Sequence, residues 1–403
     1  MPGALEARFE RLIAGDGDEA QALSGCAWAI IRNGRIAASD AVGYANPLTR
    51  RHLRADAPMR VASISKLATT ILILQQVDAG RIGIDDDVSE TLGFSLRNPA
   101  FPSAPVTVRL LLSHRSSMRD GAVYWGALGE RLSDFFAPGG VRWEDGAHWD
   151  EAQPPGAYFK YCNLGFGVLA TLVEKLEGKR FDIVAHESLL HPLGLDSGFN
   201  WSGSEDAYIA RGAPLWQPEN GAWAAQLDEP LPVGRAPLFL NPNELPLAGY
   251  SIGENGLLFS PQGGLRASVR DLARIGALLI GHSAPFLSAQ SLALMQTQSW
   301  RFDGANGDDE NGFWRAYAHG MQIIAADDPA CPIANLRRSL VGHSGDAYGL
   351  RGGLFLDPQA RSGFAFLFNG GPADDVRARG ARSGFLRSEE AALGALYDAA
   401  VRG

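Results

Sequence analysis

The segment from Ile64 to Ala79 is apolar or small on nearly every side, and a glycine follows it at once. A helix on a protein surface shows a polar face, whereas a helix that is apolar all round has to be covered by other elements. Glycine just past the last periodic residue is a common helix stop, because it adopts the left-handed conformation without steric cost. The sequence therefore predicts a buried helix that begins at Ser63.

The chain is long enough to cover such a helix, since it has 403 residues. This exceeds the size at which a single hydrophobic core stops growing, so two structural regions are expected. Hydrophobic residues make up 46% of the chain and charged residues 20%, as in ordinary globular proteins. The formal net charge of -9 disfavours a nucleic-acid partner, which would require a basic surface.

The chain shows no pattern for a metal site, export or a membrane span. Its cysteines are far apart and lack the spacing of metal ligands, which predicts reduced, buried thiols: Cys26, Cys162 and Cys331. The stretch Met1–Gly15 carries charges on a helix-like pattern, unlike a signal peptide. We therefore expect a cytoplasmic protein, or a periplasmic one if a leader was trimmed. The apolar runs are too short to cross a bilayer.

Strand patterns occur at both ends of the chain. Residues 25–43 predict two strands around Asn33-Gly34, a pair that tolerates the positive φ angles of a type I′ hairpin turn. Three further strands are expected near the C-terminus, followed by a closing helix: 320–324, 351–356, 363–369 and, for the helix, 389–401.

Helical patterns fill the middle of the chain, at 106–113, 164–176 and 268–279. Strands that flank a helical middle are best satisfied by one sheet built from both chain ends, with helices packed on it. The expected fold class is α+β. Residues 1–75 and 300–403 would form the sheet domain, and residues 76–299 a mostly helical domain. Within the latter, residues 200–255 are rich in Pro, Gly and Trp and predict a loop-rich insertion.

Ser63 and Lys66 lie three residues apart at the start of the apolar helix, so both side chains share one face. A serine hydroxyl becomes a good nucleophile when a neighbour takes its proton, and burial lowers the pKa of a lysine enough for it to do so. The alternative is an N-capping serine beside a solvated lysine. A lysine inside the most apolar helix is costly without a partner, which favours the catalytic interpretation.

Two other groups of polar residues stand out. Tyr161-Cys162-Asn163 comes just before the second helical pattern, so an extended backbone would aim the tyrosine and the asparagine to one side. His343-Ser344-Gly345 precedes Asp346 within a run of strand and turn residues. Each group alone is weak, because a tyrosine often lies in a core and an asparagine often caps a helix.

In this order, Ser63-x-x-Lys66, Tyr161-x-Asn163 and His343-Ser344-Gly345 resemble the three motifs of the class C β-lactamase and DD-peptidase superfamily. This penicillin-binding, serine β-lactamase-like group also includes D-aminopeptidases and family VIII esterases. The resemblance covers most of the chain except about residues 120–155 and 200–255. It implies a β-lactamase/transpeptidase-like fold, in which an antiparallel sheet flanked by helices meets a mostly helical domain, with the site between them.

By matching position, the resemblance implies roles for the first two motifs. Ser63 attacks a carbonyl carbon. Lys66 and Tyr161 exchange the proton of Ser63 and protonate the leaving group. Asn163 orients the lysine and the amide or ester of the substrate.

The third motif is expected to border the substrate. The backbone N–H groups of Ser63 and Asp346 would form an oxyanion hole, and Ser344 and Gly345 would contact the substrate. His343 stands where β-lactamases of this class usually have lysine. A mostly neutral histidine lacks the fixed cation for the carboxylate of a β-lactam, so efficient β-lactam hydrolysis is not expected.

The expected function is a serine hydrolase that acts through an acyl-enzyme on small carboxylic esters or D-amino acid amides and peptides, with esters ranked first. D-aminopeptidase, DD-carboxypeptidase and weak β-lactamase activities are the enzymatic alternatives. A penicillin-recognising sensor or binding protein is the non-enzymatic alternative. No cofactor or metal is expected, a small-molecule substrate is the partner, and the sequence does not indicate an oligomeric state.

Overall fold

The main sheet starts with the hairpin predicted at residues 25–43. β1 (Gly25–Arg32) and β2 (Arg35–Asn46) pair in antiparallel fashion. Asn33 and Gly34 have φ angles of 52° and 70°, as a type I′ turn requires. β1 is buried along nearly its whole length, so it needs a partner on its other edge as well.

The computed structural model describes residues 2–15, 23–226, 247, 249–281, 284–371 and 379–402. Residues 227–246 and 248 of the predicted loop-rich insertion at 200–255 therefore lie outside the described residues. Its described part contains a short helix and a two-stranded sheet: α8 (Asp206–Ala210), β6 (Leu215–Glu219) and β7 (Ala222–Gln226).

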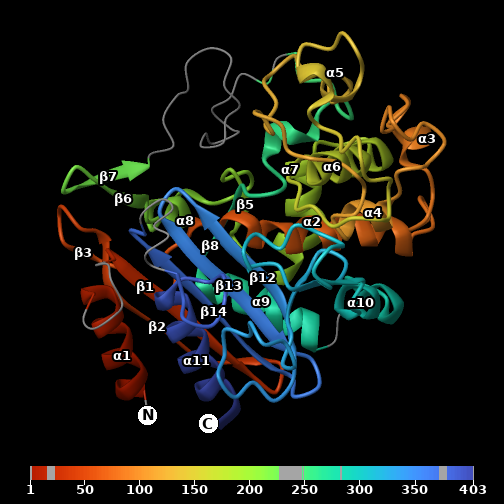
Figure 1. The fold of residues 1–403 in the computed structure, drawn as a ribbon. Helices are drawn as coiled ribbons and strands as arrows, with labels where there is room; N and C mark the ends of the chain where they lie inside the picture. Colours follow the sequence, from red (N-terminus) through yellow and green to blue (C-terminus); the bar gives the residue numbers. More distant parts are fainter. Residues whose placement is uncertain are drawn as a thin grey trace.

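Strands from both ends of the chain form one nine-stranded sheet, in the order β3-β2-β1-β14-β13-β12-β11-β10-β9 (Figure 1). β14 (Ser362–Asn369) is the second partner of β1. The strand pairings of this sheet are antiparallel, and the C-terminal strands predicted from the sequence are present. The remaining strands are β3 (Arg51–His52), β9 (Trp300–Arg301), β10 (Ala316–Tyr317), β11 (Gln322–Ile324), β12 (Leu340–Ala347) and β13 (Leu350–Asp357).

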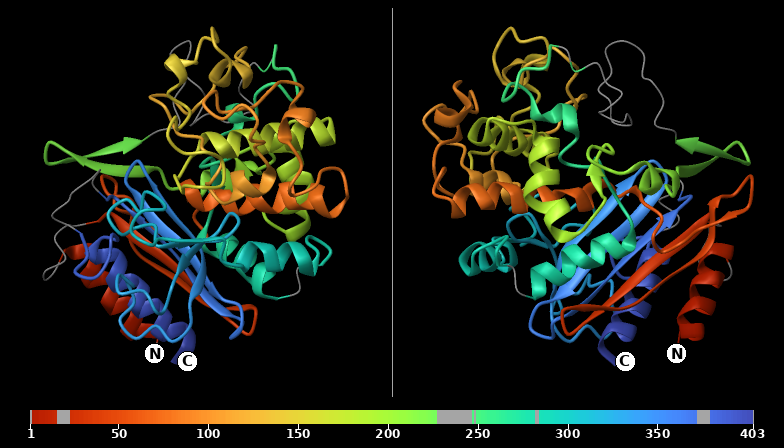
Figure 2. Two further views of the ribbon diagram at one scale, coloured as in Figure 1. Left: turned by 45° about the vertical axis from the view of Figure 1, so that its right-hand side comes forward. Right: turned by 180° about the vertical axis from the view of Figure 1, so that it is seen from behind.

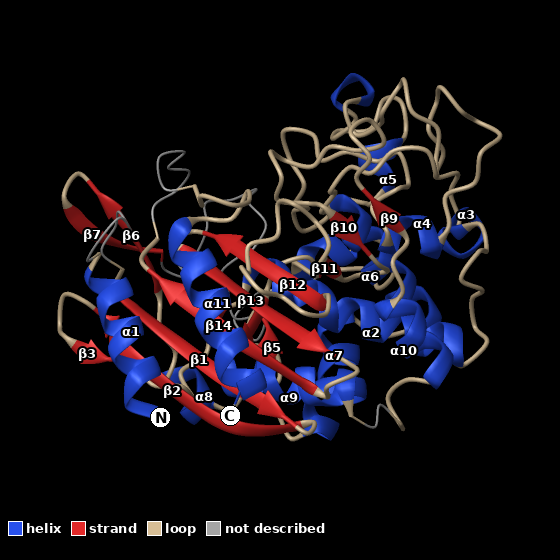
Figure 3. Ribbon diagram, turned by 60° about the horizontal axis from the view of Figure 1, so that its bottom comes forward, coloured by secondary structure: helices blue, strands red, loops and turns tan. Residues whose placement is uncertain are grey.

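Helices cover both faces of the sheet (Figure 3). α1 (Pro2–Ala14) and α11 (Arg387–Arg402) pack on one face, and α9 (Val269–Ile280) packs on the other. α9 begins at a capping box, in which Ser268 and Asp271 satisfy each other's backbone N–H groups. The boundaries predicted from the sequence place α9 in the helical domain, at 76–299, although it packs on the sheet. The division into two domains is a proposal.

The apolar segment forms the buried helix that was predicted. α2 (Ser65–Asp78) packs against α6 (Leu164–Glu177), within the helical cluster seen beside the sheet in Figure 2. A 3-10 turn, η1 (Ala62–Ile64), precedes α2, so the α-helix starts two residues after the predicted position. The chain is α+β, as expected. The other helices are α3 (Val88–Leu92), α4 (Val108–Leu112), α5 (Ser133–Phe136), α7 (Phe181–Ala185) and α10 (Ala289–Gln296).

A second, three-stranded sheet lies at the entry to α2, in the order β4-β8-β5. Its strands are β4 (Met59–Arg60), β5 (Gly198–Phe199) and β8 (Leu265–Ala267). The backbone N–H of Val61 also donates to the carbonyl of Leu265 at 3.0 Å. This sheet fixes the chain immediately before Ser63.

Two helical glycines offer a stability test of this packing. A Cβ at Gly394 in α11 meets open space, whereas a Cβ at Gly276 in α9 meets Ile31, Leu354 and Leu356 of the sheet at 2.8–3.0 Å. Gly394→Ala should therefore stabilise the protein by about 0.5–1 kcal/mol, and Gly276→Ala should destabilise it by about 1–3 kcal/mol. Urea unfolding followed by circular dichroism measures both. Equal effects of the two variants would contradict the packing of α9 on the sheet.

Candidate active site

The backbone around Ser63 is tightly constrained. Ala62, in the same 3-10 turn, has a φ angle of 47°, a conformation that costs a non-glycine residue about 1–3 kcal/mol. On the other side, a Cβ at Gly345 of β12 would lie 2.6 Å from the carbonyl oxygen of Val61. Position 345 therefore has to be glycine for the strand to approach this turn. Gly345 itself does not line the pocket beside Ser63, so its place in the structure differs from the expected substrate contact.

Lys66 is fully buried, and its amine lies at the centre of a small group of oxygen atoms. Nζ is 3.1 Å from Oγ of Ser63, 2.7 Å from Oδ1 of Asn163 and 3.0 Å from the carbonyl oxygen of Gln262. The expected convergence of Ser63, Lys66 and Asn163 is present in the structure. Gln262 was not anticipated, because a backbone carbonyl leaves no signal in the sequence.

Burial lowers the pKa of Lys66 from 10.5 to about 7, although the nearby Asp120 and Cys162 act in the opposite direction. A neutral amine has two N–H groups and one lone pair. If the oxygens of Asn163 and Gln262 accept the two N–H groups, the lone pair is left facing the hydroxyl of Ser63. The geometry is that of a base next to a nucleophile.

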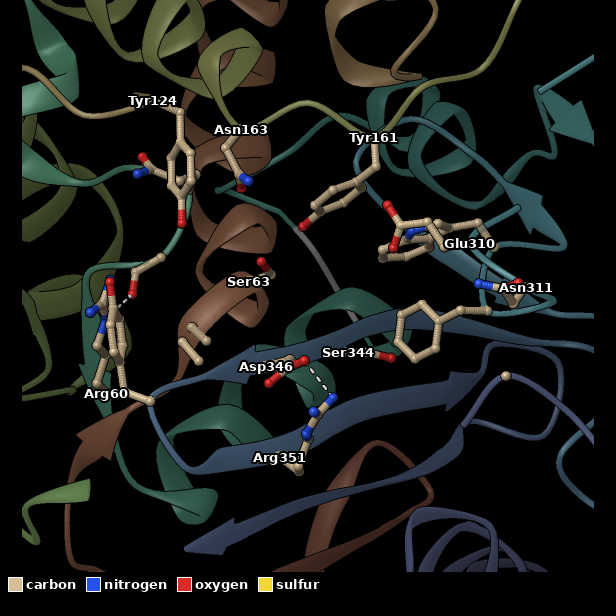
Figure 4. A pocket seen from close by; sticks show the side chains of 18 of the residues that line it. Arg60, Ser63, Tyr124, Tyr161, Asn163, Glu310, Asn311, Ser344, Asp346 and Arg351 are labelled. Carbon is tan, nitrogen blue, oxygen red and sulfur yellow. Dashed lines mark hydrogen bonds and ion pairs between the residues drawn. The ribbon is translucent and has the colours of Figure 1, made fainter. Parts of the chain in front are cut away.

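The ring of Tyr161 lies beside Asn163, and its hydroxyl points toward Ser63 (Figure 4). Its ring stacks on Trp314 with centroids 4.4 Å apart and lies 4.8 Å from Nζ of Lys66. The hydroxyl oxygen is buried and has no hydrogen-bond partner within the described residues. Burial and Tyr317 raise the pKa of Tyr161 well above 10, whereas Ser63 lowers it. The phenol therefore keeps its proton at neutral pH and can donate it.

Asp120 holds Asn163 in place and was missed from the sequence. Its carboxylate accepts hydrogen bonds from the backbone N–H of Asn163 at 2.9 Å, from Nδ2 of Asn163 at 2.7 Å and from the backbone N–H of Leu164 at 2.9 Å. These bonds fix the amide so that its oxygen faces Lys66. Asp120 lies at the edge of the stretch where the family resemblance is lost, and nothing in its local sequence distinguishes it from other surface acids.

His343 lies behind the wall of the pocket, and this changes the expectation drawn from the sequence. The residue is fully buried and does not line the pocket. Its Nε2 is 2.9 Å from the hydroxyl of Tyr317, and its Nδ1 is 2.6 Å from the carbonyl oxygen of Ser344. Since only an N–H can bond to a carbonyl, Nδ1 carries the proton and Nε2 accepts from Tyr317.

A second histidine completes this buried row. Nδ1 of His114 accepts the backbone N–H of Cys162 at 3.1 Å, and its Nε2 lies 3.2 Å from the hydroxyl of Tyr317. Burial and the nearby Lys66 lower the pKa of His343 to about 3, and the same two causes lower the pKa of His114 well below 6.5. Both rings are therefore neutral, as expected for His343. The row ties the second motif, through Cys162, to the third.

A pocket of about 430 Å³ opens over Ser63 (Figure 4). Both residues proposed for the oxyanion hole, Ser63 and Asp346, border it, and so does Ser344. The side chain of Asp346 forms an ion pair with Arg351. The remaining lining residues are Arg60, Ala62, Tyr124, Tyr161, Asn163, Gln262, Gly263, Glu310, Asn311, Phe313, Trp314, Ala347, Tyr348, Arg351, Arg379 and Gly384.

The described residues contain neither a cluster of metal ligands nor a helix that could span a membrane. No group of three or more His, Cys, Asp or Glu residues among them could hold a metal ion. No helix in the described ranges has the length and apolar character needed to cross a membrane. The three cysteines are buried and unpaired with one another, as predicted.

Comparisons with known proteins identify the family of the chain. The family model described as Beta-lactamase matches residues 9–387. Over 142 residues the chain is 31% identical to "Penicillin-binding protein 4" of Amycolatopsis lactamdurans, covering 35% of each protein. Over 186 residues it is 27% identical to "D-aminopeptidase" of Brucella anthropi, covering 42% of this chain and 32% of the relative. The matches thus span only about a third of the length of these curated relatives.

Solved structures share the fold at low identity. The octameric penicillin-binding protein homologue from Pyrococcus abyssi superposes with a TM-score of 0.70 and 22% identity, covering 100% of this chain and 77% of that one. The D-amino acid amidase from Ochrobactrum anthropi SV3, complexed with L-phenylalanine amide, gives a TM-score of 0.70 and 17% identity, covering 99% of both chains.

Replacing Asp120 by asparagine tests its effect on Lys66 and Asn163. The charge of Asp120 raises the pKa of Lys66, so Asp120→Asn should shift the rising limb of the pH–rate profile to lower pH. Asparagine keeps only one acceptor oxygen, so some of the three hydrogen bonds are lost, and kcat should fall about 10- to 100-fold through misplacement of Asn163. Asp150→Asn is the control, because Asp150 pairs with Arg119 and does not line the pocket. An unmoved limb with normal kcat would refute the positioning role.

Proposed function

Because the chain belongs to the β-lactamase family, a family of serine hydrolases, we propose that it cleaves its substrate through an acyl-enzyme formed on Ser63. The observation that carries the proposal is the buried amine of Lys66, within hydrogen-bond distance of Ser63, Asn163 and Gln262. The resemblance inferred from the three motifs is confirmed by the family match. The role of each residue is our proposal.

In the proposed first step, neutral Lys66 accepts the proton of Ser63 while Oγ attacks the carbonyl carbon of the substrate. The negative charge that develops on the carbonyl oxygen is stabilised by the backbone N–H groups of Ser63 and Asp346. Tyr161 then donates its proton to the leaving group as the bond to the carbonyl carbon breaks. Lys66 returns the proton it took to Tyr161, which leaves an acyl ester on Ser63 and a neutral amine.

In the second step, water attacks the acyl ester. Lys66 accepts a proton from the water molecule and passes it to Oγ of Ser63 as that oxygen leaves, so the amine is neutral again. The products are the carboxylic acid and the free enzyme. No metal or cofactor takes part in this scheme, which uses only side chains and backbone groups around the pocket.

We propose small carboxylic esters and D-amino acid amides or peptides as the substrate class. The relatives named D-aminopeptidase support the second part of this class. DD-carboxypeptidase and weak β-lactamase activities rank lower, because His343 is neutral and lies behind the pocket wall, where it offers no cation to a substrate carboxylate. A non-catalytic penicillin-recognising protein would not require the base and acid arrangement around Ser63.

Covalent labelling tests the nucleophile. A fluorophosphonate probe should add one adduct to the protein, and Ser63→Ala should abolish it, because the hydroxyl of Ser63 has the amine of Lys66 3.1 Å away. Ser344→Ala is the matched control, since Ser344 also lines the pocket but its hydroxyl bonds to Gln322. Intact mass spectrometry measures the adduct. Labelling that persists in Ser63→Ala but is lost in Ser344→Ala would identify Ser344, and not Ser63, as the nucleophile.

The pH dependence tests the base. With a pKa of about 7, Lys66 loses its proton as the pH rises, so kcat/KM should increase about tenfold per pH unit below 7 and level off above it. Tyr161→Phe should lower the plateau and keep the limb, whereas Lys66→Ala should remove the limb. The double variant should cost little more than the worse single variant, because both residues serve one proton relay. If the rising limb of the pH profile were lost in Tyr161→Phe and kept in Lys66→Ala, the phenolate of Tyr161 would be the base.

A further inference from the structure

A strained turn brings an acidic side chain into the pocket. Glu310 and Asn311 both line the pocket, and their φ angles are 46° and 61°. Two successive non-glycine residues in the left-handed region are unusual and costly, and such strain persists only where the surroundings enforce it. Because this strained turn lies beside the reacting groups, it points to a functional role for one of its side chains.

The surroundings of this turn do enforce its shape. The backbone N–H groups of Gly312, Phe313 and Trp314 all donate to the carbonyl oxygen of Asp309, at 3.0, 2.8 and 3.0 Å. The N–H of Glu310 donates to Oδ1 of Asp308 at 3.0 Å. Four backbone donors thus hold the turn, and the side chain of Glu310 borders the pocket.

The turn is also joined to the segment just before Tyr161. The N–H of Asp308 donates to the carbonyl of Phe159 at 2.9 Å, and Phe159 in turn donates to Asn306 at 3.0 Å. Lys160 forms an ion pair with the side chain of Asp308. Glu310 is therefore held at a fixed position relative to the tyrosine.

Glu310 lies on the side of Ser63 where the leaving group departs. The leaving group has to face Tyr161, which supplies its proton in the proposed function. The negative charge of Glu310 contributes to the raised pKa of Tyr161, so the two groups are electrostatic neighbours. In Figure 4, Glu310 lies next to Tyr161, whereas Arg60 and Tyr124 lie across the pocket.

The carboxylate of Glu310 has no ion-pair partner among the described residues. Lys160, which is already paired with Asp308, acts on Glu310 from a distance. Glu310 is exposed to the pocket, yet loss of water at the pocket wall raises its pKa, and Trp314 and Lys160 oppose this rise. Within the described residues, the leaving-group side of this pocket thus carries a carboxylate that forms no ion pair.

We propose that Glu310 is a specificity-determining residue that favours a leaving group with a positive charge, such as an amine-bearing alcohol or amine, and disfavours a leaving group with a carboxylate. The proposal rests on the proposed acyl-transfer function. It excludes substrates whose departing part ends in a carboxylate, as the departing residue of a C-terminal peptide bond does. It ranks cationic and neutral esters or amides above them.

Arg379 is the competing influence, because it lines the same pocket and is exposed. Arg379 is not among the main influences on the pKa of Glu310. If Arg379 rather than Glu310 faced the leaving group, the selectivity would have the opposite sign. Variants of Arg379 and of Glu310 should therefore change the preference for a cationic over an anionic leaving group in opposite directions. The same set of substrates distinguishes the two cases.

The test uses three acetate esters that share the acyl group and differ only in a meta substituent on the phenol that leaves: trimethylammonium, methyl and carboxylate. The wild type should show a cation-to-anion ratio of kcat/KM that falls about tenfold in Glu310→Gln and inverts in Glu310→Lys, as expected for one nearby charge. Added salt should reduce the wild-type ratio. Intrinsic ester reactivity cancels, because each ratio is compared between variants.

Glu90→Gln is the control for net charge, since Glu90 is exposed on α3 and does not line the pocket; it should keep the wild-type ratio. An identical ratio in wild type and Glu310→Gln, with the methyl ester still hydrolysed, would overturn the proposal. So would a preference for the carboxylate ester that is lost in Arg379→Gln. Absence of any ester hydrolysis together with an unlabelled Ser63 would instead count against the proposed function itself.

Discussion

The amine of Lys66 is the interaction on which the site depends. The charged form of a lysine is unfavourable when it is removed from water. Burial of Lys66 in α2 therefore lowers its pKa and requires polar partners. The three oxygens that it meets come from η1, the start of α6 and the loop before β8, which are distant in sequence. One buried nitrogen therefore fixes the mutual positions of three separate elements. The burial that helps to pack these elements also makes the amine a base.

The surrounding electrostatics divide the proton-transfer roles. Lysine is shifted toward the neutral form, tyrosine is kept protonated, and the two histidines behind the wall are neutral. Two carboxylates also act on these groups, Asp120 beneath Asn163 and Glu310 beside Tyr161.

Sequence reasoning found what local patterns encode. The hairpin at Asn33-Gly34, the apolar helix and the Ser63–Lys66 spacing depend on neighbours within a few residues, and all three are present. Asp120 and Gln262 escaped prediction because their partners lie far away along the chain and one of them acts through its backbone. His343 was placed by its motif along β12, but a motif carries no information about depth, and only the packed structure shows Tyr317 between this residue and His114.

The pairing of β1 with β14 has a consequence for how the protein is made. β1 leaves the ribosome early, yet its second edge is completed only by a strand near the other end of the chain. Translation at about 5–20 residues per second leaves this apolar edge open for a time on the order of tens of seconds. During that interval the nascent hairpin presents unpaired backbone groups to any neighbouring strand. Newly synthesised chains should therefore depend on chaperones more than the stability of the finished sheet suggests.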